Sequence, residues 1–380
     1  MDKVEFSDPL FFLNVIGMHP FKADKFSKFR LAFSIAVYFA VIFSGVLELI
    51  VNSQGLETYA RASDTLIPQC QLVCKIFVLA KYKKQIARLL NGSQRFWDLG
   101  QFGARYGNSF GKTHKYLKSF FLLYKVMLTF TCLQFLAVKI IFKIPKPIAI
   151  SFGETKGLEP LYDHLYLVLH AMITLVTINL VNGFDGLFFY FIGHVLTELK
   201  MVKVAFGDSP IETNWSEEKR FKFAVRHHRF VLDFIEQFNI VYCTMLLVQH
   251  LTCLFGICFG VFLMTKDGVP PDLDRASKYL PYIVTFIFQT FTFCFAGNLL
   301  LSWSLEIPNE IFYHDWAKKT TYENKLAKII SMKRGQRAAR LTLGGFANLD
   351  LDSFRMVLKN ALSFFTFVNA MMNKKAVTSV

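Results

Sequence analysis

The chain has 380 residues, of which 53% are hydrophobic, and it contains 43 phenylalanines. This composition is far from that of an ordinary soluble domain and indicates a protein whose solvent is lipid. The formal net charge of +15 does not indicate nucleic-acid binding, because the lysines and arginines fall in blocks between apolar stretches rather than along one basic face.

Seven mostly apolar stretches of about 20 residues predict transmembrane helices. In chain order they cover residues 31–51, 59–80, 117–142, 165–191, 240–265, 282–305 and 353–372. Polar residues interrupt the second stretch, namely Arg61, Asp64, Pro68, Gln69, Gln71 and Lys75. We therefore expect the second helix to be buried against protein rather than lipid.

The basic residues set the expected orientation of these helices. Lysine and arginine are abundant after the second, fourth and sixth stretches, and five of them precede the first. Loops rich in lysine and arginine stay in the cytoplasm, so the amino terminus is predicted inside and the carboxyl terminus outside. The expected fold is an all-α polytopic membrane protein with seven transmembrane helices. This orientation is the reverse of that of a G-protein-coupled receptor.

Two cytoplasmic segments have apolar residues at helical spacing. Residues 230–238 carry one stripe, which predicts that the fifth helix begins well before the membrane. A second stripe, through Tyr322, Leu326, Ile329 and Ile330, lies among lysines. It is typical either of a helix lying flat on the inner leaflet or of a cytoplasmic helix that packs against another subunit. We expect Gly344-Gly345 to end this helix, and Asp350 or Asp352 to cap the next one.

No enzymatic motif is present in the sequence. It lacks HExxH, GxSxG, a P-loop and a GxGxxG in strand context, so we expect no catalytic residues, no cofactor and no metal site. It also lacks the Asp-Arg-Tyr and Asn-Pro-x-x-Tyr motifs of G-protein-coupled receptors. The internal repeat and the broken spans of many transporters are not visible either.

Two segments near the carboxyl end resemble the insect odorant receptor family. They read FCFAGNLLLSWSLEIPNEIFYHDW (residues 293–316) and LDLDSFRMVLKNALSFFTFVNAMM (residues 349–372). The family pattern near the sixth helix falls here on Cys294, Gly297, Asn298, Ser304, Tyr313 and Trp316. Together with the inverted seven-helix topology, these residues make the resemblance extend over essentially the whole chain.

Two features distinguish the chain from the co-receptor and from the related gustatory receptors. The family's co-receptor has a much longer loop between the fourth and fifth helices, whereas this loop covers only residues 201–229. The chain therefore looks like a tuning, odorant-binding subunit. Gustatory receptors end with a Gln-Phe pair, but the equivalent stretch here is Ser363-Phe364-Phe365. The alternatives that remain are a gustatory or G-protein-coupled-type chemoreceptor and a multipass transporter.

The resemblance implies an odorant-gated, non-selective cation channel in the plasma membrane of olfactory sensory neurons. Its partners would be a co-receptor in a heteromeric assembly of four subunits, a volatile small molecule, cations and membrane lipid, but no nucleic acid. The expected regions are a cytoplasmic segment (1–30), an odorant-binding bundle (31–305), a cytoplasmic assembly helix (306–345) and a pore-lining helix with a short outer tail (346–380).

The resemblance also implies which residues form the pore and the subunit contacts. Helix seven would line the pore with Ser363, Phe367, Ala370 and Met371, which fall on one helical stripe. A ring of apolar side chains closes a pore by dewetting, although the same stripe also suits an ordinary packing face. Assembly contacts would come from Trp316, Tyr322, Leu326, Ile329 and Ile330.

In the family, the odorant pocket lies in the outer half of the membrane among helices two, three, four and six. The matching positions are Gln69, Val73, Phe130, Gln134, Phe135, Tyr166, His170, Ile173, Tyr282, Phe286 and Gln289. They provide the mostly apolar and aromatic lining, with a few polar groups, that small-molecule pockets need. Each of them also suits a plain packing residue, and His170 suits a buried imidazole. In helix five, Gly256 and Gly260 form a GxxxG that favours close helix packing.

Overall fold

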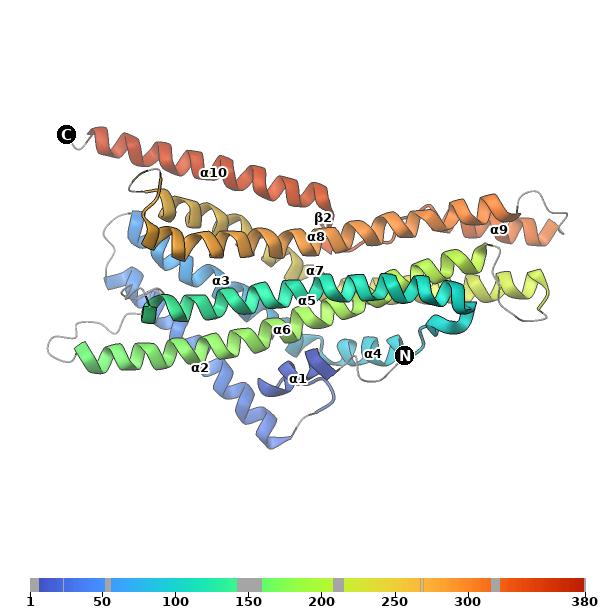
Figure 1. Cartoon of the computed structure of the whole chain (residues 1–380), viewed down its shortest axis with the longest axis horizontal. Coiled ribbons are helices and arrows are strands. Elements are labelled where there is room, and N and C mark those ends of the chain that lie inside the picture. Colours follow the sequence, from blue (N-terminus) through green and yellow to red (C-terminus); the bar gives the residue numbers. More distant parts are fainter. Residues whose placement is uncertain are drawn as a thin grey trace.

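The computed structural model describes residues 7–22, 24–51, 56–141, 159–207, 215–266, 268, 270–315 and 322–378. Long helices run roughly parallel to one axis of the molecule (Figure 1). The elements are α1 (Ser7–Val15), α2 (Lys25–Val51), α3 (Leu56–Lys81), α4 (Lys83–Ser93), a 3₁₀ turn (Leu99–Phe102), α5 (Ala104–Ile141), α6 (Glu159–Phe206), α7 (Glu217–Thr265), α8 (Leu273–Asp315), α9 (Tyr322–Gly335), β1 (Thr342–Leu343), β2 (Ala347–Asn348) and α10 (Leu351–Thr378). The expected all-α fold is confirmed.

Each predicted transmembrane stretch falls on one long helix, in the order α2, α3, α5, α6, α7, α8 and α10. Among the described residues, all of these except α3 and α10 are long and apolar enough to cross a membrane by length and composition. The polar residues of α3 are buried inside the bundle, including Asp64, Gln69, Gln71 and Lys75. The polar side of α3 is therefore covered by protein, as expected, whereas Val73 and Phe77 on its other side are exposed. The number of crossings and their orientation stay predictions.

Helices α6 and α7 are much longer than a membrane is thick. They contain 48 and 49 residues, which corresponds to about 70 Å against a hydrocarbon thickness of about 30 Å. Helix α7 begins at Glu217, so the predicted extension before the membrane is confirmed. Its apolar stripe packs inward, because Val231, Phe234, Ile235 and Phe238 are all buried.

Aromatic side chains fill the bundle near the inner ends of the predicted spans. Phe188 of α6 has its ring centroid 4.5 Å from that of Phe293 of α8 and 5.2 Å from that of Phe238 of α7. Tyr242 lies against the same rings, and all four side chains are buried. This cluster joins three long helices through closely packed aromatic rings.

The segment between α9 and α10 corrects one expectation. Helix α9 already ends at Gly335, so Gly344-Gly345 does not break a helix. The two glycines instead form the turn between β1 and β2, with φ angles of +61° and +83°, a region that favours glycine because it has no Cβ. Asp350 accepts a hydrogen bond from the backbone N–H of Ser353 at 2.9 Å, which confirms the predicted cap of α10.

Two residues of the motif in α8 hold this segment in place, and a third, Cys294, contacts α7. The hydroxyl of Ser304 accepts a hydrogen bond from the N–H of Ala339 at 3.0 Å. A Cβ on Gly297 would lie 2.1 Å from the carbonyl oxygen of Leu349, so only glycine fits there. Cys294 lies 3.2 Å from the His250 imidazole. The motif therefore positions the chain that leads into α10.

Candidate functional site: a cavity among four helices

A cavity of about 170 Å³ lies between α3, α5, α6 and α8. These are the second, third, fourth and sixth predicted membrane helices. The lining residues come from the half of each predicted span that is expected to face outward. The volume is close to that of the apolar cavity of about 150 Å³ in which T4 lysozyme binds benzene, so the space suits a small volatile molecule.

Seven of the predicted pocket residues line this cavity. Four are apolar or aromatic and three bring polar groups, which is the composition expected of a small-molecule site. They are Gln69 from α3, Phe135 from α5, His170 and Ile173 from α6, and Tyr282, Phe286 and Gln289 from α8.

The other four predicted pocket residues do not line the cavity. Val73 and Phe130 point away from the bundle, with exposed fractions of 41% and 64%. Tyr166 is buried behind the wall and packs edge-on against His170. Gln134 lies at the rim, where its amide donates to the carbonyl of Ser277. The sequence pattern placed these residues on the right helices, but not all of them on the inward face.

Hydroxyl groups form a part of the lining that the sequence argument missed. Thr65, Thr131, Thr174, Thr177 and Thr285 all face the cavity. The hydroxyls of Thr131 and Thr285 lie 2.6 Å apart and bridge α5 to α8. All five stand three, four or seven positions from a predicted pocket residue, so extending the list by helical periodicity would have found them.

A proline shapes the α3 wall. Pro68 lies inside the helix and lines the cavity. It has no N–H to donate to the carbonyl of Asp64, so one hydrogen bond of the helix is absent beside the cavity. At the next residue, the side-chain oxygen of Gln69 is buried and accepts no hydrogen bond from any described residue. Both features leave hydrogen-bonding capacity in the α3 wall.

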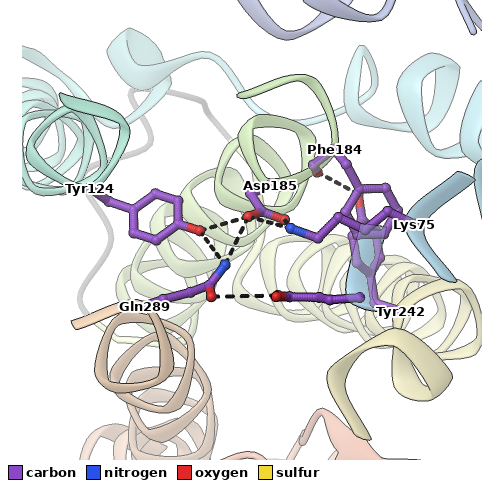
Figure 2. A network of polar contacts seen from close by, with 7 residues as sticks. Lys75, Tyr124, Phe184, Asp185, Tyr242 and Gln289 are labelled. Carbon is purple, nitrogen blue, oxygen red and sulfur yellow. Dashed lines mark hydrogen bonds and ion pairs between the residues drawn. The ribbon is translucent and has the colours of Figure 1, made fainter. Parts of the chain in front are cut away.

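A buried polar network forms the inner end of the cavity (Figure 2). The amide of Gln289, a lining residue, donates to the hydroxyl of Tyr124 at 2.9 Å, and this hydroxyl donates to Asp185 at 2.6 Å. Asp185 also forms an ion pair with Lys75 at 2.8 Å, and the two side chains are 1% and 0% exposed. Gln71 donates to Gln289 at 3.4 Å. The network therefore ties α3, α5, α6 and α8 together directly beneath the cavity.

Polar contacts also cross the opposite, outer end of the cavity. Lys278 of α8 lies 3.2 Å from the carboxylate of Asp64 of α3, and both side chains are mostly buried. The ammonium of Lys278 also donates to the hydroxyl of Tyr279. Together with the contact between Gln134 and Ser277, this ion pair holds the outer ends of three helices around the opening.

A match to a family model identifies the kind of protein that carries this cavity. The model for the "7tm Odorant receptor" family matches residues 61–362. The chain belongs to the insect odorant receptor family. Within it, this member is 25% identical to odorant receptor 85c of Drosophila melanogaster over 162 residues, which is 42% of this chain and 41% of that protein. It is 26% identical to putative odorant receptor 85e of the same species over 40% of this chain and 32% of that one. These matches thus span less than half the length of the relatives.

Solved structures share the fold of this family member. The insect olfactory receptor OR5 from Machilis hrabei in complex with eugenol superposes with a TM-score of 0.81, covering 96% of this chain and 97% of that one. The structure of the same receptor described without eugenol gives a TM-score of 0.80. Sequence identities are 14% and 13%, so these likenesses concern the fold.

The predicted pore residues of this odorant receptor family member lie on α10, at one edge of the bundle (Figure 1). Ser363, Phe367 and Ala370 are exposed, Phe367 by 58%. The side chain of Met371 lies outside the described residues.

The predicted assembly residues are also exposed. Tyr322, Leu326, Ile329 and Ile330 lie on α9 and have exposed fractions between 45% and 80%. Trp316 lies outside the described residues. The described residues of the chain therefore leave much of the α9 stripe uncovered, as either a subunit contact or a membrane contact requires.

Two aromatic rings that line the cavity also contact α7, at the predicted GxxxG. A Cβ on Gly256 would lie 3.3 Å from the ring of Phe286, and one on Gly260 would lie 3.3 Å from the ring of Tyr282. On a neighbouring face of α7, Phe255 packs edge-on against Phe364 of α10 at 5.9 Å. A continuous series of contacts thus runs from the cavity wall, across α7, to the predicted pore helix.

Proposed function

We propose that the chain is the odorant-binding, tuning subunit of an odorant-gated, non-selective cation channel. It assembles with a co-receptor, in a complex of four subunits, in the plasma membrane of olfactory sensory neurons. The observation that carries this proposal is the cavity among α3, α5, α6 and α8, whose lining is apolar with a few convergent polar groups. Family membership supports the same role.

The cavity indicates the class of ligand. Its volume of about 170 Å³ and its aromatic rings, Phe135, Tyr282 and Phe286, suit a small ring or a short branched chain. The side-chain oxygen of Gln69 and the threonine hydroxyls suit one hydrogen-bonding group on that molecule. The related receptor from Machilis hrabei was solved with eugenol, which supports an oxygen-bearing volatile as the ligand here.

The contacts across α7 suggest how ligand binding reaches the pore. A molecule in the cavity presses on Tyr282 and Phe286, whose rings lie against the glycines of α7. Displacement of α7 then moves Phe255 against Phe364 and shifts α10. A ligand opens the channel only if it binds the open arrangement more tightly than the closed one. We expect the close fit of these two rings on the glycines to give the closed and open arrangements different affinities for the ligand.

The exposed face of α10 fits a pore lining. Phe367 is 58% exposed, and its ring lies 6.4 Å from that of Phe364 on the same helix. Around a central axis shared with other subunits, its ring would form an apolar constriction that excludes water until α10 moves. Exposure of the α9 stripe supports its use as a contact with the co-receptor.

Recording of currents tests the proposal against a G-protein-coupled alternative. Cells expressing the full chain with and without an odorant receptor co-receptor are exposed to a panel of small volatiles while G-protein signalling is blocked inside the cell. We expect odour-evoked cation current that needs both subunits and survives the block. Current that disappears with the block, or uptake of the volatile without any current, would contradict the channel.

A further inference from the structure

A second cavity, of about 280 Å³, lies between α1, α5 and α6, away from the odorant cavity. One wall is a stripe of α5 that includes His114, Lys118 and Lys125, at positions i, i+4 and i+11 on one helical face. The facing wall belongs to α6, where Gly193 leaves room: its Cβ would be 3.7 Å from the ring of Phe121. The site is therefore hollow and basic on one side.

The charges around this cavity are unequal. Two lysines line it, and Lys125 lies 3.8 Å from the carboxylate of Asp8, the acidic residue in the lining. The imidazoles of His114 and His194, with ring centroids 5.1 Å apart, add polar groups at one end. Lysine ammonium groups beside other hydrogen-bonding groups suit a phosphate, and among the described lining residues two ammonium groups stand against one carboxylate.

An exposed apolar stripe begins at the same cavity and continues along α5. It consists of Leu122, Val126, Phe130 and Leu133, whose exposed fractions lie between 50% and 64%. These residues fall at i, i+4, i+8 and i+11, so they form one face about 16 Å long. Only Leu122 of the four also lines the cavity. A molecule with a charged head and an apolar chain fits this arrangement, whereas a wholly polar solute would leave the stripe uncovered.

The two helices place the cavity at the predicted cytoplasmic membrane surface. The membrane stretch of α5 is expected to begin at residue 117, and that of α6 to end near residue 191. Lys118 and Gly193 lie at these two inner ends, and both line the cavity. Basic pockets between helices on the cytoplasmic side bind phospholipid head groups. We propose that this cavity holds the head group of an anionic phospholipid of the inner leaflet, with an acyl chain along the α5 stripe.

Lipid titration of the purified full-length chain tests this proposal. In mild detergent, phosphatidylserine and phosphatidylcholine are added separately, and bound lipid is counted by native mass spectrometry. We expect tighter binding of phosphatidylserine. Because one lysine near a membrane surface contributes about a fivefold factor in affinity, Lys118→Gln with Lys125→Gln should weaken phosphatidylserine binding by about 25-fold.

Matched variants separate a defined site from diffuse surface charge. Lys112→Gln with Lys115→Gln removes two exposed lysines of the same helix that do not line the cavity, and we expect less than about a twofold change. Gly193→Leu keeps every charge but fills the cavity, so it should also reduce phosphatidylserine binding. Elution of each variant as a single symmetrical size-exclusion peak shows that it is folded.

Three results would overturn the site. The first is equal weakening by the two lysine pairs, and the second is unchanged binding by Gly193→Leu. The third concerns the source of the phosphate: glycerophosphoserine, which has the head group without acyl chains, should compete poorly. If it displaces the lipid at equal concentration, the cavity holds a soluble phosphate compound rather than a membrane lipid.

Discussion

In the half of the bundle that is predicted to face the cytoplasm, Phe188 packs between rings of α7 and α8 at centroid distances of 4.5–5.2 Å. In the half that is predicted to face outward, the helices stand around a cavity and are joined by polar bridges such as Asp64–Lys278 and Thr131–Thr285. Dense aromatic packing resists deformation, whereas hydrogen bonds around a space can be exchanged for bonds to a ligand. One bundle can thus combine a rigid, aromatic half with a binding half that adapts to a ligand.

The ion pair of Lys75 and Asp185 lies where the two halves meet, and breaking it should have the largest effect. Lys75→Met leaves Asp185 buried without its cation, which we expect to cost about 3–5 kcal/mol of stability. Thermal unfolding of purified protein, followed by size-exclusion chromatography, measures this loss. The double change Lys75→Met with Asp185→Leu should recover most of it. If both variants lose the same stability, the two residues do not act as a pair.

Shortening one phenylalanine in each half compares packing with binding directly. Phe188→Ala should destabilise the protein by about 3–5 kcal/mol, because the side chain is fully buried in a dense cluster. Phe135→Ala only enlarges an existing cavity, so its cost should be smaller, while the odorant sensitivity of the channel should change. Unfolding temperature and current dose-response curves report the two effects. Equal destabilisation by both variants would remove the distinction between the halves.

Gly256→Ala tests whether movement passes from the cavity to α7. The added methyl group would lie 3.3 Å from the Phe286 ring, which pushes α8 away from α7. We expect a reduced maximal current with little change in surface expression. Gly111→Ala is the control, because nothing lies within 4 Å of its added methyl group. A full current from the Gly256 variant would show that the glycine contact does not transmit the signal.

Gln69→Leu should have a smaller and more selective effect. Loss of one hydrogen bond to a ligand costs about 0.5–1.5 kcal/mol, so half-activation by a volatile alcohol should need about two- to tenfold more ligand. Activation by a hydrocarbon of the same shape should not weaken. Gln249→Leu removes a buried glutamine outside the cavity lining and serves as the control. An identical shift for alcohol and hydrocarbon would mean that Gln69 acts through packing.

The last prediction concerns a glycosylation pattern in α4, where we expect no effect at all. Asn91-Gly92-Ser93 has the pattern of a glycosylation acceptor, but it lies in α4 at the end assigned to the cytoplasm. Digestion with a glycosidase should leave the mobility of Asn91→Gln and of the original chain identical. A glycan at Asn91 would place the aromatic half outside the cell and the cavity half inside.

The sequence by itself determined the all-α membrane fold, the start of α7 well before its predicted membrane span and the helices that surround the cavity. Hydrophobic stretches and loop charges indicate which segments cross the membrane and which loops stay inside. This prediction does not require knowing which residues contact one another. The motif in α8 likewise revealed the family, although the structural role of Gly297 and Ser304 became clear only from their contacts with Leu349 and Ala339.

Only the tertiary structure decided which face of each helix meets the cavity. Val73 and Phe130 point outward, while five threonines point inward, because rotation of a helix depends on the side chains of all its neighbours. The sequence did not reveal the partner of Lys75 either, because the carboxylate that pairs with it belongs to Asp185 on α6, 110 positions away. Helix spacing in sequence fixes relative angles along one helix. The angle of that helix to the others follows from packing.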